Sequence, residues 1–480
     1  MLAMNDEHRV GTDRGTPLSR DISFWGMSIT QFLGAFNDNL YKQLMLLLAI
    51  PVGVASLGQD QQDLATIVFS LPFVLFSGYA GFLSDRYSKK TIIVISKFAE
   101  IAAMALGVAA FLAYATTGYA GLLFTLFLMG IQSAFFGPGK YGILPELFRQ
   151  RDLPRANGII LMLTFLAIIF GMVSAGFLDT WLIQRTEPLV TSASKLAIGS
   201  AFCVGIAVIG TVTALLVRYV PPAQPDLKFS LSSLVIRSDT FRVLRQDRPL
   251  VSAILASSMF WLVSGIAIQA VNSLGIVQLQ LSTLLTSIMN GVVGLGIAAG
   301  AIIGGRLCHV GGDRKVIRVG LWGIVICLTL LSISWPTGKT VAIPVEPAAV
   351  DSGGLQQEPP QNQSVSQVEH AVATKHVPTY HYLLGFRGAL IVLTLLGVSA
   401  GFFAIPLQVF IQSRPPDDQK GRMIAVMNQA NFVAIMMSGV VYGAFSRMIV
   451  VLEWPRSPVF GLMALLILPL LMFYRPTLER

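Results

Sequence analysis

Twelve apolar runs, each long enough to cross a membrane as a helix, constrain this chain more than any other feature. A bilayer core is spanned by about 20 predominantly apolar residues in helical form, and 54% of the 480 residues are hydrophobic. The runs are continuous rather than alternating, which favours helices over the strands of a closed barrel. They cover residues 22–50, 64–84, 91–115, 118–137, 156–178, 196–220, 250–275, 282–308, 316–335, 383–412, 422–447 and 457–474.

The composition excludes several classes of protein. Only 12% of the residues are charged, against about 25% in a soluble domain, so a soluble enzyme, a disordered protein and a secreted disulfide scaffold are excluded. The net charge is +9, but the basic residues stand in short loops between apolar runs, so we expect no nucleic-acid partner. The three cysteines, Cys203, Cys308 and Cys327, lie in or beside apolar segments and predict no disulfide framework.

The distribution of Lys and Arg predicts the orientation of the chain. If the N-terminus is cytoplasmic, the inner segments carry 25 Lys and Arg, the outer loops carry 7, and Lys42 and Lys97 lie within apolar runs. Because positively charged loops stay on the cytoplasmic side, we expect both termini in the cytoplasm. Residues 1–20 are polar, and the long apolar run that follows has no cleavage site, so a signal peptide is not expected.

The runs form two sets of six separated by a long basic loop, which is typical of two fused halves. Matching Gly81 to Gly305 gives an offset of 224, and matching Gly130 to Gly397 gives 267. The difference of 43 is close to the 47 residues of the segment 336–382, so one insertion in the second half accounts for it. The expected organisation is a cytoplasmic tail at 1–21, a six-helix bundle at 22–220, a cytoplasmic linker at 221–249, a second six-helix bundle at 250–474 and a cytoplasmic tail at 475–480.

Two segments are not expected to cross the membrane. The linker 221–249 carries four arginines among Leu and Phe residues, which fits either a basic amphipathic helix on the membrane surface or a solvated linker. The segment 336–382 is rich in Pro, Gln, Val and Ser and is expected to be a flexible extracytoplasmic insertion. It contains His370, His376 and His381, but three histidines in such a segment do not predict a metal site, and no cofactor is expected.

Small residues and prolines recur at positions that matter for helix packing. Gly296, Gly300 and Gly304 are spaced by four, which predicts a face on which two helices approach closely. Pro138 and Pro406 occupy corresponding places in the two halves and are expected to bend their helices.

The segment from residue 81 to residue 90 reads GFLSDRYSKK. It resembles the signature loop of the major facilitator superfamily, roughly G-x-L-a-D-r-x-G-r-K, with Ser88 where the family usually has Gly. The resemblance implies an all-α membrane protein with twelve transmembrane helices in two pseudo-symmetric six-helix bundles. An acidic residue at a helix end and cations at the cytoplasmic face suit such a loop. The loop residues expected to act in gating are Asp85, Arg86, Lys89 and Lys90.

Three further motifs resemble a narrower family. Residues 31–39 read QFLGAFNDN, residues 135–147 read FFGPGKYGILPEL, and residues 401–408 read GFFAIPLQ. They are similar to the bacterial lysophospholipid transporter family, including the transporter domains fused to 2-acylglycerophosphoethanolamine acyltransferases. The similarity runs through most of the chain except the insertion.

The resemblance implies a multi-pass protein of the bacterial inner membrane. Such a protein moves lysophospholipid, chiefly lysophosphatidylethanolamine, from the outer to the inner leaflet by alternating access. It implies a monomer surrounded by membrane lipids, with a separate acyltransferase as a partner. No enzymatic activity is expected, because no further domain follows the last apolar run.

Three positions depart from the family pattern. Leu161 stands where members commonly have an acidic residue, Ile268 and Gln269 follow Trp261 where an Arg is usual, and an acidic residue is replaced near Asn431. These changes keep a second hypothesis open, that the protein is an exporter or carrier of another amphipathic molecule, including a proton-coupled one.

Asp38 is the leading candidate for substrate binding, because an ionisable group within a membrane span is costly and marks function. Gln31, Asp38 and Lys42 follow helical spacing and share one face. Asp38 could bind the ammonium and Lys42 the phosphate of a zwitterionic headgroup, or the two could form a structural pair. The expected substrate-binding set is Asp38, Lys42, Gln31, Asn37, Gln269 and Asn428.

Two further charged positions have alternative interpretations. Lys140 follows a Gly-Pro-Gly turn that suits a phosphate or a conformational latch. Glu146, six residues later, is either its gate partner or an anchor at the membrane interface. Glu100 either pairs with Lys97, three residues earlier, or contacts the substrate.

Overall fold

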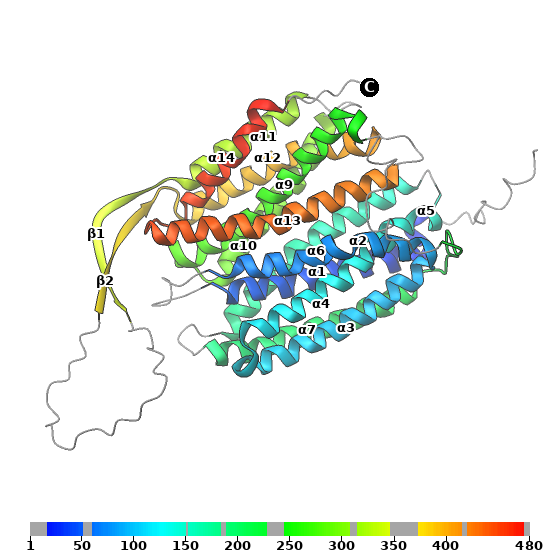
Figure 1. Ribbon diagram of the computed structural model, residues 1–480, viewed down its shortest axis with the longest axis horizontal. Coiled ribbons are helices and arrows are strands. Elements are labelled where there is room, and N and C mark those ends of the chain that lie inside the picture. Colours follow the sequence, from blue (N-terminus) through cyan, green and yellow to red (C-terminus); the bar gives the residue numbers. More distant parts are fainter. Residues whose placement is uncertain are drawn as a thin grey trace, which may run out of the picture.

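The structure of the protein is a computed structural model dominated by long helices (Figure 1). It describes residues 17–50, 60–149, 152–183, 189–227, 244–307, 314–345, 373–414 and 420–474.

The long helices coincide with the apolar runs of the sequence. Before the linker they are α1 (Ile22–Leu48), α2 (Gln62–Arg86), α3 (Lys89–Leu112), α4 (Tyr114–Gly142), α6 (Leu153–Leu182) and α7 (Leu189–Leu215), with the short α5 (Leu144–Leu147) after α4. After the linker they are α9 (Arg248–Ser273), continued by the π-helix η5 (Leu274–Gln278), and α10 (Thr283–Leu307), α11 (Arg314–Ser332), α12 (Gly385–Ser413), α13 (Lys420–Val451) and α14 (Pro458–Phe473).

Ten of the described helices are long and apolar enough to cross a membrane. They are α2, α3, α4, α6, α7, α9 with η5, α10, α11, α12 and α13. The 27-residue α1 is not among them, because polar residues such as Asn37, Asp38 and Lys42 lower its mean hydropathy. The apolar helix α14 is shorter. The cap of α1 is well defined, because the Asp21 carboxylate accepts hydrogen bonds from the backbone N–H groups of Ser23 and Phe24.

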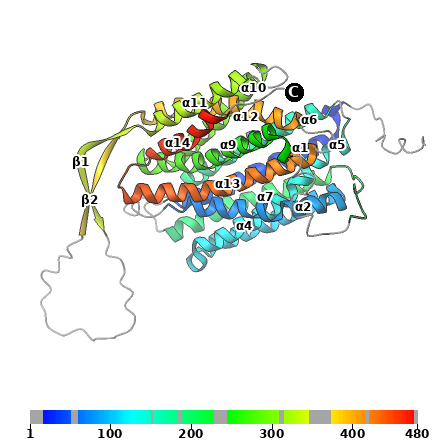
Figure 2. The same cartoon turned by 45° about the horizontal axis from the view of Figure 1, so that its top comes forward.

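The helices pack side by side along the long axis of the molecule (Figures 1 and 2). In the part before the linker, α1 packs on α6 and α7, α3 on α4 and α7, and α2 on α4. In the part after it, α9 packs on α13, α10 on α12, and α11 on α12 and α14. The two parts meet where α2 packs on α13 and α6 on α10.

The predicted glycine face on α10 is confirmed as a packing surface. A Cβ atom added at Gly300 would overlap the backbone of Val398 on α12, and one at Gly304 would lie 3.3 Å from Phe402. On α12 a glycine also stands at this contact: a Cβ atom at Gly401 would lie 2.6 Å from the backbone of α10. Missing side chains on both helices therefore let their backbones approach closely.

A buried ion pair lies inside the first part. The Lys97 ammonium donates to the Glu100 carboxylate within α3, and both side chains are at most 2% exposed. Glycines on two neighbouring helices make room for it: a Cβ atom at Gly34 on α1 would lie 3.2 Å from the Lys97 Nζ atom, and one at Gly210 on α7 would lie 3.0 Å from it. The predicted pairing of Glu100 with Lys97 is thus confirmed.

The segment 336–382 contains strands that the sequence did not predict. β1 (Ser334–Val345) and β2 (Ala373–Tyr382) form an antiparallel pair with an irregularity between Pro336 and Thr340. Thr, Val, Ile and Tyr favour this pairing, but interspersed prolines hide the pattern in the sequence. The strands extend from one end of the helices (Figure 2), which we call the hairpin end. Residues 346–372, between the strands, lie outside the described residues.

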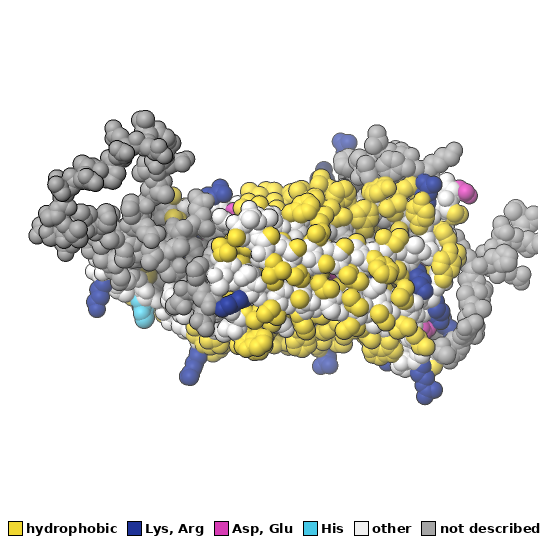
Figure 3. All heavy atoms as spheres, turned by 90° about the horizontal axis from the view of Figure 1, so that it is seen from below, with side chains coloured by type: hydrophobic (Ala, Val, Ile, Leu, Met, Phe, Trp, Pro, Cys, Tyr) yellow, Lys and Arg dark blue, Asp and Glu magenta, His cyan; other side chains and the backbone are white. Residues whose placement is uncertain are grey.

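The outer surface of the helices is apolar. Large side chains such as Trp181, Phe124 and Leu255 are 60–70% exposed, and Figure 3 shows hydrophobic side chains over much of one face of the molecule. A soluble protein rarely exposes contiguous apolar patches of this extent, so this surface suits a lipid environment.

We expect Gly300→Ala to destabilise the protein, because the new methyl group overlaps α12. Overpacking of this kind costs about 1–3 kcal/mol, so the thermal midpoint of the detergent-solubilised protein should fall. Gly305→Ala on the same helix is the matched control, since its Cβ atom meets nothing within 4 Å. Equal midpoints for the two variants would contradict the packing role.

Lys97→Met should destabilise the protein more strongly, because it leaves the Glu100 carboxylate buried without its partner. Breaking a buried pair from one side costs about 3–5 kcal/mol. The double variant Lys97→Met/Glu100→Leu should recover most of the loss in thermal midpoint. A double variant less stable than the single one would show that the pair contributes more than mutual neutralisation.

Candidate functional site

Asp38 lies in the middle of α1 and is turned toward α4. Its carboxylate accepts a hydrogen bond from the Ser133 hydroxyl (2.6 Å) and a longer one from the Gln132 amide (3.3 Å). The Gln132 amide also donates to the Ser133 hydroxyl oxygen (2.7 Å). Two polar side chains of α4 thus fix the carboxylate, and its remaining lone pairs can still accept hydrogen bonds from a cation.

Lys42, one turn along α1 from Asp38, has a different neighbour. Its ammonium lies 5.2 Å from the centre of the Phe69 ring on α2, a cation–π contact. These two described side chains form no direct ion pair, so the structural pairing of Asp38 with Lys42 is not observed. The two charges lie one helical turn apart and are not paired with each other. They can therefore interact with the two opposite charges of one zwitterion.

The other predicted residues of α1 point to different helices. The Asn37 amide donates to the Glu100 carboxylate (2.9 Å) and to the Cys203 carbonyl (3.2 Å), so Asn37 joins α1 to α3 and α7. Gln31 donates to the Thr164 hydroxyl on α6 (2.9 Å). The structure therefore brings Asp38 near Lys42 but does not bring Asn37 or Gln31 to the same place.

The loop between α2 and α3 is tied to its own part of the chain. The Lys89 ammonium pairs with the Glu146 carboxylate (2.5 Å), which joins the start of α3 to α5. Lys90 donates to the Leu215 carbonyl at the end of α7 (3.1 Å).

The other two predicted gating residues belong to the same region. The Asp85 carbonyl accepts from the backbone N–H of Gln224 (2.9 Å). The Arg86 guanidinium lies 5.6–6.0 Å from the ring centres of Phe82 and Tyr87. This loop therefore fastens α2 to α3, α5, α7 and the segment that follows α7.

The sequence did not predict a polar network that joins the two parts of the chain at the hairpin end. Asp60, just before α2, accepts hydrogen bonds from the Ser273 hydroxyl (2.5 Å), the Tyr442 hydroxyl (2.6 Å) and the Gln62 amide (3.0 Å). Asp60 and Gln62 belong to the first part, whereas Ser273 on α9 and Tyr442 on α13 belong to the second.

Amides extend this network. The side-chain oxygen of Gln62 accepts a hydrogen bond from the Asn272 amide (2.9 Å). The side-chain oxygen of Asn272 in turn accepts hydrogen bonds from Gln43 on α1 (3.0 Å) and from Asn290 on α10 (2.7 Å). Every member is at most 6% exposed. The hairpin-end network consists of Gln43, Asp60, Gln62, Asn272, Ser273, Asn290 and Tyr442.

A second contact joins the two parts at the same end. The Thr283 hydroxyl at the start of α10 donates to the Asp179 carboxylate at the end of α6 (2.6 Å), and the Thr180 hydroxyl accepts from the backbone N–H of Leu284 (3.0 Å). At the opposite end, by contrast, the ion pairs Lys89–Glu146 and Arg414–Asp247 each lie within one part. Among the residues that the structure describes, the polar contacts between the parts therefore gather at the hairpin end.

The predicted residues of the second part lie apart from Asp38's hydrogen-bond partners. The Gln269 amide donates to the Gly265 carbonyl of its own helix (3.0 Å) and is buried. Asn428 lies half-buried on α13. Asn431 accepts hydrogen bonds from Ser257 (3.2 Å) and Ser258 (3.3 Å), so it joins α13 to α9.

No group of three or more His, Cys, Asp or Glu residues that could hold a metal ion is found in the described part of the chain. The His381 ring lies 4.8 Å from the Trp335 ring at the base of the hairpin. His370 and the side chain of His376 lie outside the described residues.

Relatives of known name support the resemblance seen in the sequence. The chain is 25% identical over 421 residues to proteins named Lysophospholipid transporter LplT from Salmonella typhimurium (strain LT2) and Salmonella agona (strain SL483). Each alignment covers 85% of this chain and 84% of the relative. The expected similarity to lysophospholipid transporters is thus confirmed.

Solved structures show the same fold at low identity. A POT family transporter in complex with a thioalcohol-conjugated peptide matches with a TM-score of 0.62 and 13% identity, covering 95% of this chain and 96% of that one. The nucleoside transporter NupG matches with a TM-score of 0.58 and 13% identity, covering 94% and 99%.

The model of the Major Facilitator Superfamily matches residues 27–350, which is more than half of the chain. The helical architecture and the solved structures agree with this match. The chain belongs to the Major Facilitator Superfamily.

Proposed function

We propose that this protein transports lysophospholipid, with lysophosphatidylethanolamine as the expected substrate, from the outer to the inner leaflet of the bacterial inner membrane. The carboxylate of Asp38, fixed by α4 in the middle of α1, is the observation that carries the proposal. The relatives named as lysophospholipid transporters support the substrate class. The protein acts as a monomer without enzymatic activity of its own, and a separate acyltransferase re-acylates what it delivers.

The contacts between helices support twelve spans in two six-helix bundles, and the distribution of Lys and Arg supports cytoplasmic termini. The pairs α1–α6, α2–α4, α3–α4 and α3–α7 correspond to α9–α13, α10–α12, α11–α12 and α11–α14. Under the same correspondence α2 matches α10 and α6 matches α13. The two contacts between the parts, α2–α13 and α6–α10, are therefore equivalent to each other. Such an exchange is expected of two repeats related by a pseudo-twofold axis along the membrane normal.

Asp38 and Lys42 suit the two charges of a phosphoethanolamine headgroup. The Asp38 carboxylate accepts hydrogen bonds from the ammonium, and Lys42 donates to the phosphate, as charge-assisted hydrogen bonds that are strong away from water. The apolar exterior of the helices leaves the acyl chain in contact with hydrocarbon. The headgroup crosses while the chain stays in an apolar environment.

The polar contacts between the two parts support a conformation closed at the hairpin end. The excess of Lys and Arg in the loops at the opposite end supports an extracytoplasmic hairpin end. Alternating access then requires the Asp60-centred network and the Asp179–Thr283 contact to break when the transporter opens outward, while the bundles rock about Asp38.

A carrier of another amphipathic molecule is the second candidate. Leu161 is 44% exposed on α6 where the family commonly has an acidic residue, and the Gln269 amide bonds to its own helix. Competition for uptake between lysophospholipid and amphipathic drugs separates the two hypotheses.

Asp38→Asn should reduce uptake of labelled lysophosphatidylethanolamine by about tenfold or more, because a charge-assisted hydrogen bond contributes about 1.5–3 kcal/mol. Uptake is measured in proteoliposomes at matched protein content. Asp226→Asn, in an exposed loop, removes the same charge elsewhere and should transport like the parent. Parental uptake by Asp38→Asn would remove Asp38 from the mechanism.

Asp60→Ala should favour the outward-open conformation, because it removes the acceptor shared by Ser273, Tyr442 and Gln62. A cysteine placed at Ile276, which is buried against Leu47 and Ile50, reports the opening in a background without the native cysteines. Its labelling by a membrane-impermeant maleimide from outside should rise several-fold. Asp226→Ala serves as the control, and unchanged labelling in Asp60→Ala would show that the network does not hold this end closed.

A further inference from the structure

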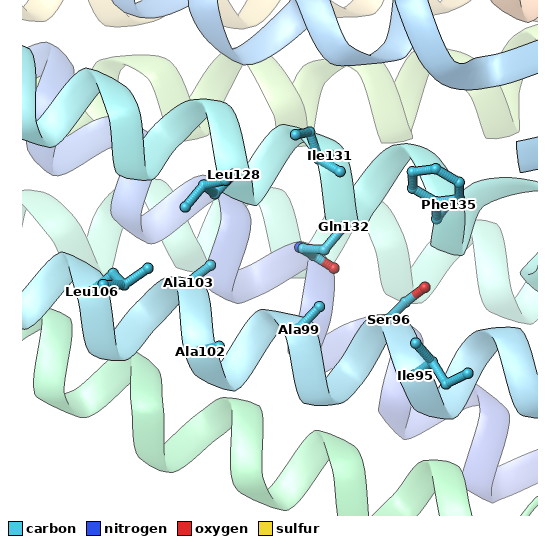
Figure 4. A pocket seen from close by; sticks show the side chains of 10 residues that line it. All are labelled: Ile95, Ser96, Ala99, Ala102, Ala103, Leu106, Leu128, Ile131, Gln132 and Phe135. Atoms are coloured by element: carbon cyan, nitrogen blue, oxygen red, sulfur yellow. The ribbon is translucent and has the colours of Figure 1, made fainter. Parts of the chain in front are cut away.

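A narrow crevice opens on the outside of the first part, between α3 and α4 (Figure 4). It has a volume of about 280 Å³, and it lies at the middle of both helices, away from their ends. Its lining residues are Ile95, Ser96, Ala99, Ala102, Ala103 and Leu106 of α3 and Leu128, Ile131, Gln132 and Phe135 of α4.

Small side chains on one helix create the crevice. Ser96, Ala99 and Ala103 follow helical spacing on α3 and leave space beside the larger Leu128 and Phe135 of α4. Both helices are membrane spans, so hydrocarbon chains rather than water reach this space from outside. Its volume is just below the range of about 300–1,000 Å³ for sites that hold drug-sized ligands, which suits part of one acyl chain better than two.

Two polar side chains, Gln132 and Ser96, line this apolar space. Gln132 is 5% exposed, and its amide nitrogen donates to Asp38 and to Ser133. Because an ionised carboxylate only accepts hydrogen bonds, the nitrogen must face Asp38 and the oxygen must face the other way. Figure 4 shows that oxygen directed into the crevice, on the side of Ala99. Among the described residues no donor to this oxygen is found.

An acceptor that faces hydrocarbon without a donor is costly, so it favours a ligand that brings a hydroxyl or an amine together with an apolar chain. A lysophospholipid is such a molecule, because hydrolysis of one ester leaves a free hydroxyl on the glycerol next to the remaining chain. A diacyl phospholipid lacks this donor and carries a second chain.

We propose that the α3–α4 crevice binds the acyl chain of the lysophospholipid, and that the Gln132 amide oxygen accepts a hydrogen bond from its free glycerol hydroxyl. This inference rests on the proposed function and adds the feature that distinguishes monoacyl from diacyl lipids. Gln132 connects the two sites, because one end of its amide holds Asp38 and the other end receives the hydroxyl.

The first test locates the chain. The purified full-length protein in vesicles of phosphatidylethanolamine and phosphatidylglycerol is irradiated with a lysophosphatidylethanolamine that carries a diazirine on its acyl chain. Adducts should concentrate on peptides that contain residues 95–106 and 128–135, and excess unlabelled lysophosphatidylethanolamine should remove them. Adducts elsewhere, or equal labelling by a diacyl probe, would overturn the proposal.

The second test fills the crevice. Ala99 and Ala105 are both exposed on the surface of α3. Ala99 lines the crevice, whereas Ala105 does not. Ala99→Phe should lower uptake of lysophosphatidylethanolamine at least fivefold, and Ala105→Phe should transport like the parent. Equal uptake by the two variants would overturn the proposal.

The third test addresses the hydroxyl. In the parent protein, lysophosphatidylethanolamine should compete for uptake about fivefold better than its methyl ether, because the ether cannot donate the one hydrogen bond to Gln132. Gln132→Met should abolish this preference. Ser133→Ala should keep it, because that variant removes the bonds of the Ser133 hydroxyl to Asp38 and to the Gln132 nitrogen but leaves the Gln132 oxygen in place. A preference that survives in Gln132→Met would overturn the proposed role of Gln132.

The outcomes separate the two proposals. If the parent protein takes up no lysophospholipid, the proposed function fails and this inference fails with it. If the parent does take it up while the crevice variants and adducts give the contrary results, the function stands and the crevice is excluded. Should Gln132→Met fail to fold, the adducts and the Ala99→Phe and Ala105→Phe pair decide the matter.

Discussion

Hydrocarbon forms no hydrogen bonds, so each polar side chain within a membrane span must find its partner in the protein itself. This constraint explains why Asp38 is fixed by Ser133 and Gln132 of the neighbouring α4. It also explains why the charges of Lys97 and Glu100 neutralise each other within one helix. A polar group that remains exposed to the membrane or to a cavity under this constraint is a strong indication of a ligand.

The same constraint shapes how the two parts of the chain meet. In the described part of the chain their polar contacts gather at the hairpin end, where the Asp60 carboxylate is shared by donors from both parts. Glycines such as Gly300 and Gly401 keep α10 and α12 in close contact within one part. Dense packing inside each part and separable hydrogen bonds between them are the properties that two rocking bundles need, because each bundle must move as a rigid body.

The proposed sites divide the recognition of an amphipathic lipid between two environments. Asp38 and Lys42 offer opposite charges near the middle of α1, and the α3–α4 crevice offers an apolar space with the Gln132 oxygen as an acceptor. Gln132 belongs to both, since its amide nitrogen and oxygen face opposite sides. A headgroup and a chain need such different surroundings that one uniform pocket would serve neither.

The sequence by itself determined where the helices lie, because continuous apolar runs of sufficient length have few other stable structures in a membrane. It also identified Asp38 as a candidate for substrate binding, since a carboxylate in such a run is costly. Its spacing from Lys42 suggested an ion pair. In the structure, however, Asp38 accepts a hydrogen bond from Ser133, and the Lys42 ammonium lies over the Phe69 ring. Helical spacing tells which residues share a face but not which helix packs against that face. For the same reason the network around Asp60, whose members come from five separate segments, was decided by tertiary structure alone.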